Sequence, residues 1–197
     1  MTRIFDILFS FLGLVILSPI LIVLMVIGYF DTGTPIFRQE RVGKGMKPFR
    51  LVKFRSMYVN APSVATHLAN VSSITPVGSF LRKSKLDELP QLWNVFVGDM
   101  SLVGPRPNLF NQEELIHERD SRGVYSVRPG ITGLAQINKI DMSTPQLLAE
   151  TDAKMIQELN THGYFKYIFL TVFGKGFGDR IVKENKNGTI TSKSSHS

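Results

Sequence analysis

Residues Ile4–Phe30 form an almost unbroken apolar segment, and no other feature limits the possible folds of this chain as strongly. As a helix rising about 1.5 Å per residue, the segment would extend roughly 40 Å, enough to cross a hydrocarbon core of about 30 Å. The apolar run is too long for a cleavable signal peptide, and no small-x-small cleavage pattern follows it. The sequence therefore predicts that residues 1–30 are a membrane anchor.

The dipeptide Ser18-Pro19 in the middle of this segment decides its shape. Proline removes one helical hydrogen bond and clashes with the preceding turn, while serine can satisfy the freed carbonyl. Two shapes remain open: a kinked helix that crosses the bilayer, and a helix-break-helix hairpin whose halves reach about mid-bilayer. The downstream side is expected in the cytoplasm because it is rich in basic residues, namely Arg38, Arg41, Lys44, Lys47, Arg50, Lys53 and Arg55.

The composition narrows the class of partner. A chain of 197 residues fits one domain and is long enough to bury a core. Its formal net charge of +7 favours polyanionic partners: nucleic acid, an anionic membrane surface or phosphorylated substrates. The absence of cysteine excludes disulfides and thiolate metal sites, and the four histidines lie too far apart to show metal-ligand spacing.

The rest of the chain is predicted to adopt an α+β fold that is mostly helical. Asp31–Met57 alternates short apolar pieces with Gly and Pro turns, which predicts a small β-hairpin or meander. Asn111–Arg122 and Met142–Asn160 are predicted to be polar helices, the first of them solvent exposed. Tyr164–Phe173 fits either an amphipathic interfacial helix or a buried core helix. Three shorter segments complete the prediction: a weak helix over Ala61–Ser73, a turn over Thr75–Gly78 and a polar, disordered tail over residues 181–197.

The stretch Arg82–Pro107 concentrates the residues that could carry chemistry. The adjacent acids Asp87 and Glu88 follow three basic residues, and an apolar run then continues past Pro90 to Gly98. Because proline is tolerated in the first turn of a helix and glycine is favoured just past its end, the pattern predicts a short helix starting near Asp87. The two acids would then lie at its N-terminus, a position suited to a phosphate or a reactive carboxylate.

Carboxylates beside several cations indicate an acid that stays ionised in a site that also attracts anions. An ionised Asp87 could attack phosphorus, and Glu88 could hold a divalent cation or handle protons. Arg106 lies between two prolines, which present its guanidinium fork to phosphate oxygens with little freedom to lose. The structural alternative is a helix-capping aspartate beside a solvated glutamate.

Three segments resemble the bacterial sugar transferase family, the small monotopic phosphoglycosyl transferases that begin lipid-linked glycan assembly. They are KFRSM (Lys53–Met57), DELPQLWNVFVGDMSLVGPRP (Asp87–Pro107) and RPGITGLAQIN (Arg128–Asn138). The similarity runs from about Arg3 to about Asp152. It implies a re-entrant anchor broken at Ser18 and Pro19, followed by a membrane-apposed catalytic domain over residues 31–180. It further implies interfacial helices around an active site that faces the cytoplasm at the bacterial inner membrane.

The resemblance also implies a reaction. A sugar-1-phosphate would pass from a UDP-sugar to undecaprenyl or another polyprenyl phosphate through a covalent intermediate on Asp87, with release of UMP. This would be the first membrane step in assembling a glycoconjugate such as lipopolysaccharide, capsule, exopolysaccharide or glycoprotein. Asp87 and Glu88 would hold Mg²⁺, and five basic residues would bind phosphate or nucleotide: Lys53, Arg55, Arg82, Arg106 and Arg128. Membrane lipids are expected partners and nucleic acid is not, while homo-oligomer formation is left open.

Other function classes fit the sequence less well. The Asp-x-Asp pattern of many metal-dependent glycosyltransferases is absent, and so is the P-loop pattern of nucleotidases. A membrane-anchored basic module that binds nucleic acid or anionic lipid without turnover is the alternative of a different class. It would show binding with a steep salt dependence and no product.

Overall fold

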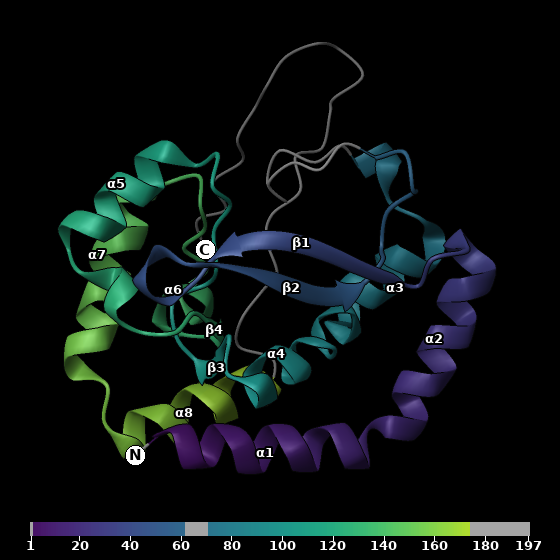
Figure 1. The fold of residues 1–197 in the computed structure, drawn as a ribbon, viewed down its shortest axis with the longest axis horizontal. Helices are drawn as coiled ribbons and strands as arrows, with labels where there is room; N and C mark the ends of the chain where they lie inside the picture. The colour runs from purple at the N-terminus through teal and green to yellow at the C-terminus, as the bar shows by residue number, and fades with distance from the viewer. Residues whose placement is uncertain (1, 62–70, 174–197) are drawn as a thin grey trace, which may run out of the picture.

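A computed structural model describes residues 2–61 and 71–173, and its α+β architecture is mostly helical, as predicted (Figure 1). The helices are α1 (Thr2–Ile16), α2 (Ser18–Thr32), α3 (Pro76–Ser84), α4 (Gln91–Val97), α5 (Glu113–Ser121), α6 (Leu134–Ile137), α7 (Pro145–Glu158) and α8 (Thr161–Val172). The strands are β1 (Ile36–Val42), β2 (Pro48–Phe54), β3 (Ser101–Val103) and β4 (Gly130–Thr132).

The apolar N-terminal segment forms two helices, α1 and α2, that meet at Leu17 with a bend of 63°. The Ser18 hydroxyl donates to the Val15 carbonyl at 2.8 Å, so serine satisfies a carbonyl at the break as the sequence predicted. Among the described residues, no single helix is long and apolar enough to cross a bilayer. The two helices of the bent pair, taken together, have the necessary length and composition. Apolar side chains such as Phe30, 82% exposed, face outward along both helices.

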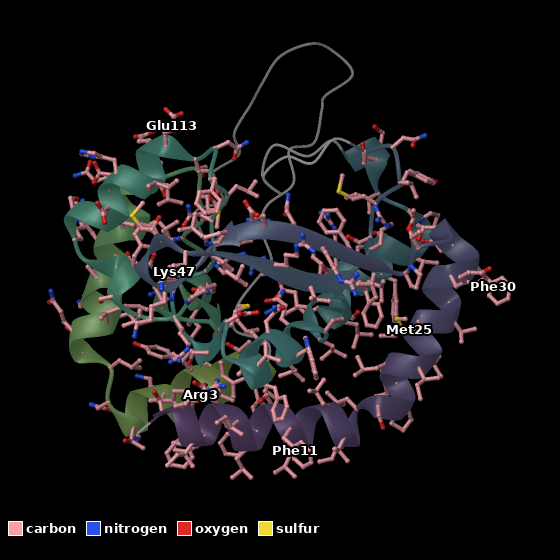
Figure 2. All side chains as sticks on the ribbon, in the orientation of Figure 1. Arg3, Phe11, Met25, Phe30, Lys47 and Glu113 are labelled. Carbon is pink, nitrogen blue, oxygen red and sulfur yellow. The ribbon has the colours of Figure 1, made fainter. Side chains whose placement is uncertain are left out.

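Both ends of this helix pair contact the same folded body. At the start of α1, the Arg3 guanidinium donates to the carbonyls of Val95 and Phe96 at 2.6 and 2.8 Å. At the end of α2, Asp31 accepts a hydrogen bond of 2.7 Å from the Thr75 hydroxyl. Figure 2 shows Arg3 turned toward the body and Phe30 turned away from it.

Strands β1 and β2 form an antiparallel hairpin, the simpler of the two predicted arrangements, which spans the middle of the molecule (Figure 1). Phe37 pairs with Lys53 in its register, so both side chains lie on one face. On the sheet, Leu51 joins a buried cluster with Val95 of α4 and Met100. The hairpin is thereby fixed to the segment that carries the acid pair.

Helix α3 was not predicted, because Thr75–Gly78 was interpreted as a turn. Thr75 is instead the N-cap: its Oγ1 accepts a hydrogen bond of 2.8 Å from the Gly78 amide, and Pro76 begins the helix. Threonine followed by proline is a typical helix start, since the cap satisfies an orphan amide and proline needs none. The prediction of a simple turn was therefore wrong.

Helices α5, α7 and α8 confirm the three helices predicted in the second half. The expected exposure of the first was only partly correct, because Arg119 of α5 is 1% exposed. Helix α8 buries Tyr164 fully and leaves Phe169 60% exposed, and its position in a membrane interface stays a prediction. Most of the weak helix predicted over Ala61–Ser73, and the whole tail over residues 181–197, lie outside the described residues.

The short parallel pair β3–β4, in which Ser101 is opposite Gly130, was not predicted. A Cβ atom on Gly130 would lie 2.0 Å from the Gly104 amide nitrogen, so the two backbones approach more closely than any side chain permits. Glycine at position 130 therefore serves the close contact between β4 and the backbone that follows β3. The pair holds Arg128–Gly130 beside the segment that leads to Arg106.

Candidate active site

The acid pair lies in a 3-10 turn, Leu86–Glu88, and not at the N-terminus of the following helix as predicted. Helix α4 begins only at Gln91, after Pro90. Proline has no amide hydrogen to donate, so the four-residue hydrogen-bond ladder cannot run through it. The backbone makes three-residue bonds instead, such as Leu89 N to Leu86 O at 3.3 Å and Trp93 N to Pro90 O at 3.0 Å.

Three cations from separate elements act on Asp87: Lys53 of β2, Arg82 of α3 and Arg106, which follows β3. Arg106 Nη2 forms an ion pair of 2.8 Å with Oε1 of Glu88. Arg82 Nε donates to the Ser56 hydroxyl at 2.8 Å, which fixes its side chain beside the end of β2. The fold thus brings four of the predicted site residues around one carboxylate that is 7% exposed.

The electrostatics of the site differ from a simple ionised acid. Burial, together with the neighbouring Glu88 charge, raises the pKa of Asp87 to about 6, although the three cations act in the opposite direction. Burial also lowers the pKa of Lys53 to about 8, against the attraction of Asp87. Near pH 7 both groups are charged, and the carboxylate is a stronger base than an exposed aspartate.

The segment carrying Arg106 is held by its backbone. Four consecutive carbonyls, from Pro105 to Asn108, each accept a hydrogen bond, and the donors come from three parts of the chain: β1, α5 and β4. The donors are Gly130 N to Pro105 O at 2.8 Å, Arg119 Nη1 to Arg106 O at 2.8 Å, Arg41 Nη1 to Pro107 O at 3.2 Å and Val42 N to Asn108 O at 3.0 Å. Arg106 is therefore presented to Glu88 from a rigid segment, which we call the PRPN loop (Pro105–Asn108).

The two remaining predicted cations, Arg55 and Arg128, contact other parts of the fold. Arg55 Nε donates to the Thr34 carbonyl at 3.0 Å, and its guanidinium carbon lies 5.3 Å from the centre of the Phe37 ring. Lys53 Nζ lies 5.5 Å from the centre of the same ring. Arg128 Nε donates to the Gly98 carbonyl at 2.8 Å, at the end of α4. Neither arginine is among the groups that shift the pKa of Asp87.

Two side chains that support the site, Arg41 and Asn108, were missed by sequence reasoning. Arg41 counted only among the basic residues that indicate the cytoplasmic side, but it is buried and also donates to the Gln39 side chain at 2.6 Å. Asn108 is fully buried and accepts through Oδ1 from Arg119 and from the Tyr125 hydroxyl. Only the alternation of the β1 strand, which sets Arg41 on the same face as Phe37, could have signalled one of them.

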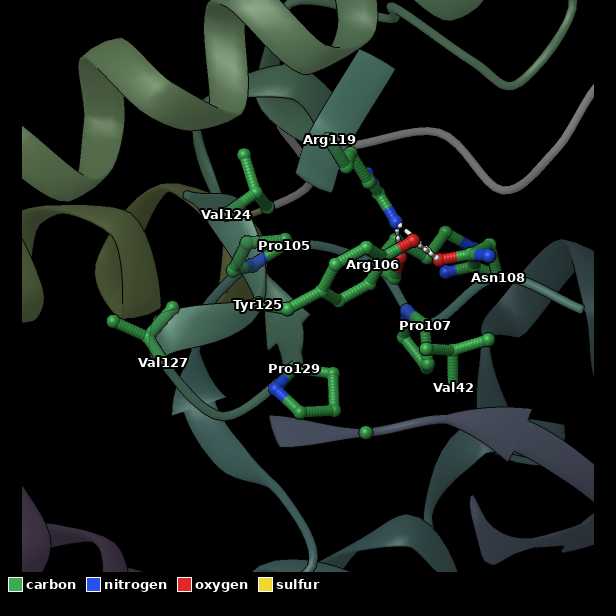
Figure 3. Close-up of a pocket in the computed structure, with 11 residues that line it drawn as sticks. Val42, Pro105, Arg106, Pro107, Asn108, Arg119, Val124, Tyr125, Val127 and Pro129 are labelled. Atoms are coloured by element: carbon green, nitrogen blue, oxygen red, sulfur yellow. Dashed lines mark hydrogen bonds between the residues drawn. The ribbon is translucent and has the colours of Figure 1, made fainter. Parts of the chain in front are cut away.

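On the side of the PRPN loop that faces α5 lies a small hollow of about 10 Å³ (Figure 3). Its walls are mostly apolar and include Val42, Val124 and Pro129, while Asn108, Arg119 and Tyr125 supply its polar groups. In Figure 3 the Arg119 guanidinium reaches across this region to Asn108 and the loop. Arg106 is itself one of the residues that line the hollow.

The donor set for a metal ion is small. Within residues 2–61 and 71–173, no group of three or more His, Asp or Glu side chains is placed to hold a metal ion. Asp87 and Glu88 nevertheless provide adjacent hard carboxylate oxygens. Mg²⁺ commonly takes one or two protein carboxylates and completes its shell with substrate phosphates and water. The residues present therefore fit an ion that is bound together with a phosphorylated substrate.

Comparison with known proteins gives one consistent result. A family model described as bacterial sugar transferase matches residues 1–176. The chain is 43% identical over 187 residues to UDP-glucose:undecaprenyl-phosphate glucose-1-phosphate transferase of Klebsiella pneumoniae, covering 89% of this chain and 40% of that protein. It is 40% identical over 182 residues to the Escherichia coli K12 protein of the same name, covering 87% and 39%.

The chain thus spans about two fifths of the length of these two relatives. A third relative has a similar size. The exopolysaccharide production protein PSS of Rhizobium leguminosarum bv. phaseoli is 36% identical over 197 residues, which cover 89% of this chain and 97% of that protein.

Proposed function

Because the chain belongs to the bacterial sugar transferase family, we propose that it transfers a sugar-1-phosphate from a UDP-sugar to undecaprenyl phosphate. The names of its relatives support this assignment of donor and acceptor. The chain would thereby catalyse the first membrane step in building a lipid-linked glycan.

One observation carries the proposal: a nearly buried carboxylate, Asp87, has cations from three other elements around it. A carboxylate that must attack a phosphorus atom in an anionic substrate needs fixed positive charge to attract that substrate. Lys53, Arg82 and Arg106 supply this charge. Glu88, paired with Arg106, keeps the guanidinium beside the nucleophile.

The reaction proposed has two displacements. In the first, an oxygen of ionised Asp87 attacks the sugar-linked phosphorus, the bond to the bridging oxygen breaks, and UMP leaves with that oxygen and its electron pair. In the second, an oxygen of the lipid phosphate attacks the same phosphorus and releases the Asp87 carboxylate. The raised pKa of Asp87 favours this role, because a more basic carboxylate is a better nucleophile while it remains ionised near pH 7.

The remaining basic residues are proposed to hold phosphate groups. Arg106 and Arg82 would bind the diphosphate beside Asp87, and Lys53 would do so in its charged form. Arg55 and Arg128 would hold the nucleotide or lipid phosphate at the edge of the site. When bound, Mg²⁺ held by Asp87 and Glu88 would neutralise phosphate charge so that an anionic nucleophile can approach.

We infer a re-entrant anchor from the contacts at its two ends. Arg3 at the start of α1 binds carbonyls of the catalytic body, and Asp31 at the end of α2 binds Thr75 of that body. A segment whose two ends contact one domain is expected to enter and leave the membrane on the same side. The Asp87 site would then face the cytoplasm, because the basic hairpin follows the anchor.

The alternative of a basic binding module without turnover is not favoured, because the relatives are named as transferases. Incubation of detergent-solubilised protein with a panel of UDP-sugars and Mg²⁺, before lipid is added, tests the proposal. The expected result is release of UMP from the correct donor by the wild-type protein and none by Asp87→Asn. Binding with a steep salt dependence and no UMP from any donor would contradict it.

A further inference from the structure

We propose that Arg119 and Asp152, a buried ion pair that touches neither Asp87 nor Glu88, act as positioning residues for Arg106 in donor binding. This inference rests on the proposed function, since it assigns to Arg106 the task of holding the donor diphosphate. It adds a second set of residues, on α5 and α7, to those that determine the activity of the site.

The Arg119 guanidinium uses its two sides for two different purposes. Its Nε and Nη2 atoms donate to Oδ2 of Asp152 at 3.1 and 2.7 Å. Its Nη1 atom donates to the Arg106 carbonyl at 2.8 Å and to Oδ1 of Asn108 at 2.9 Å. Arg119 is 1% exposed and Asp152 is fully buried, so neither side chain can reach a substrate directly. The guanidinium therefore joins α7 to the PRPN loop.

Arg119 contacts the PRPN loop at Arg106, the residue whose side chain belongs to the site. Arg119 holds the backbone carbonyl of Arg106, and the Arg106 side chain in turn pairs with Glu88 beside Asp87. The prolines on either side leave the backbone of Arg106 few other conformations. A backbone shift there would therefore carry the whole guanidinium with it. Displacement by about 1 Å of a group that positions substrate can cost about a hundredfold in rate.

Asp152 fixes the orientation of Arg119. A planar guanidinium bound on one edge by a carboxylate has its remaining nitrogen aimed in a set direction, which a lysine could not reproduce. The Tyr125 hydroxyl also donates to Asn108 Oδ1, at 3.1 Å, so the loop side of this arrangement is held from a second element. Removing only one member would leave a buried charge without its partner, and both must be replaced together.

A mutant cycle tests the inference. The double substitution Arg119→Met with Asp152→Leu replaces the pair by apolar side chains of similar size and leaves no buried charge. It is compared with wild type, with Arg106→Gln and with all three changes together. The readouts are kcat/KM for UMP release and the Kd of UDP measured by calorimetry. Arg122→Met is the matched control, because Arg122, directly after α5, also pairs with an acid of α7, Glu150, but both of these side chains are partly exposed.

The double substitution is expected to lower kcat/KM about 10- to 100-fold and to weaken UDP binding in the wild-type background. In the Arg106→Gln background it should cost less than about twofold, because the residue it positions is already gone. Arg122→Met should leave both readouts unchanged. If the double variant does not fold, as judged by thermal melting, Arg119→Lys takes its place in the same cycle.

Equal losses in both backgrounds would overturn the inference, because the loss caused by a purely structural role would simply add to the loss caused by Arg106→Gln. Wild-type kinetics in the double variant would overturn it as well. Absence of UMP release by the wild-type protein itself would instead overturn the proposed function. The two failures are therefore distinguishable.

Discussion

Asp87→Asn is expected to make the folded protein more stable while abolishing its activity. Folding raises the pKa of Asp87 from 3.8 to about 6, mainly through burial. Between those two pH values the folded protein holds a proton that the unfolded chain releases, so stability falls as the pH rises through this window. Above about pH 6 the folded wild-type protein bears the full cost of burying an ionised carboxylate. The Asp87→Asn protein has a neutral amide there and does not bear this cost.

The size of the effect follows from the shift. The pKa of Asp87 differs by about 2 between the folded and the unfolded protein, and each pKa unit corresponds to about 1.4 kcal/mol. Asp87→Asn should therefore raise the free energy of unfolding by roughly 3 kcal/mol at pH 7.5. For a chain of this length, 1 kcal/mol corresponds to about 2–4 °C in Tm, so Asp87→Asn should melt on the order of 6–12 °C higher. The difference should shrink as the pH falls below about 6 and approach zero only below pH 3.8, where Asp87 is protonated in both the folded and the unfolded states.

Thermal melting of both proteins in one detergent, between pH 4 and 8, measures this. Asp120→Asn is the control, because Asp120 is an exposed carboxylate on α5 and its replacement should change stability by less than about 0.5 kcal/mol. A Tm of Asp87→Asn equal to or below that of wild type at pH 7.5 would refute the reasoning. A gain that did not vary with pH would refute it too, since it could not come from ionisation.

Three further outcomes follow from the structure. The pH profile of kcat/KM should be bell-shaped, falling below about pH 6 as Asp87 is protonated and above about pH 8 as Lys53 loses its charge, and Lys53→Arg should remove only the alkaline fall. Thr75→Val should lower unfolding free energy by about 1–2 kcal/mol in chemical denaturation, because α3 loses its cap, while Thr75→Ser should be near neutral. Gly130→Ala should lower both Tm and activity because its Cβ would collide with the neighbouring strand, whereas Gly163→Ala, whose Cβ would meet only ordinary contacts, should leave both unchanged.

The parts of the fold that sequence reasoning predicted are those set by local pattern. The break at Ser18-Pro19, the hairpin before Met57 and the polar helices of the second half all follow from composition and turn residues within one segment. The strands Ser101–Val103 and Gly130–Thr132 have three residues each and lie far apart in the chain, so no periodicity marks them. The start of α3 did carry a local signal, since threonine followed by proline is typical of a helix start, but Thr75–Gly78 was predicted to be a turn.

The site divides in the same way. Asp87, Glu88 and Arg106 lie within one short stretch, and their residue types and the flanking prolines indicated their chemistry. Arg119 occurs in a highly charged helix that looks solvated from its sequence, and only the packing of α5 on α7 shows that it is buried against Asp152. The pKa of Asp87 also depended on burial, which no local pattern reveals.

The central claim is that Asp87 carries the phospho-sugar between the soluble donor and the lipid acceptor. Intact-protein and peptide mass spectrometry, after incubation with the active UDP-sugar and Mg²⁺ in the absence of polyprenyl phosphate, tests it most directly. A phospho-sugar adduct on Asp87, formed with release of UMP and lost when undecaprenyl phosphate is added, is the predicted result. Turnover to lipid-linked product with Asp87→Asn, or an adduct on a different residue, would contradict the claim.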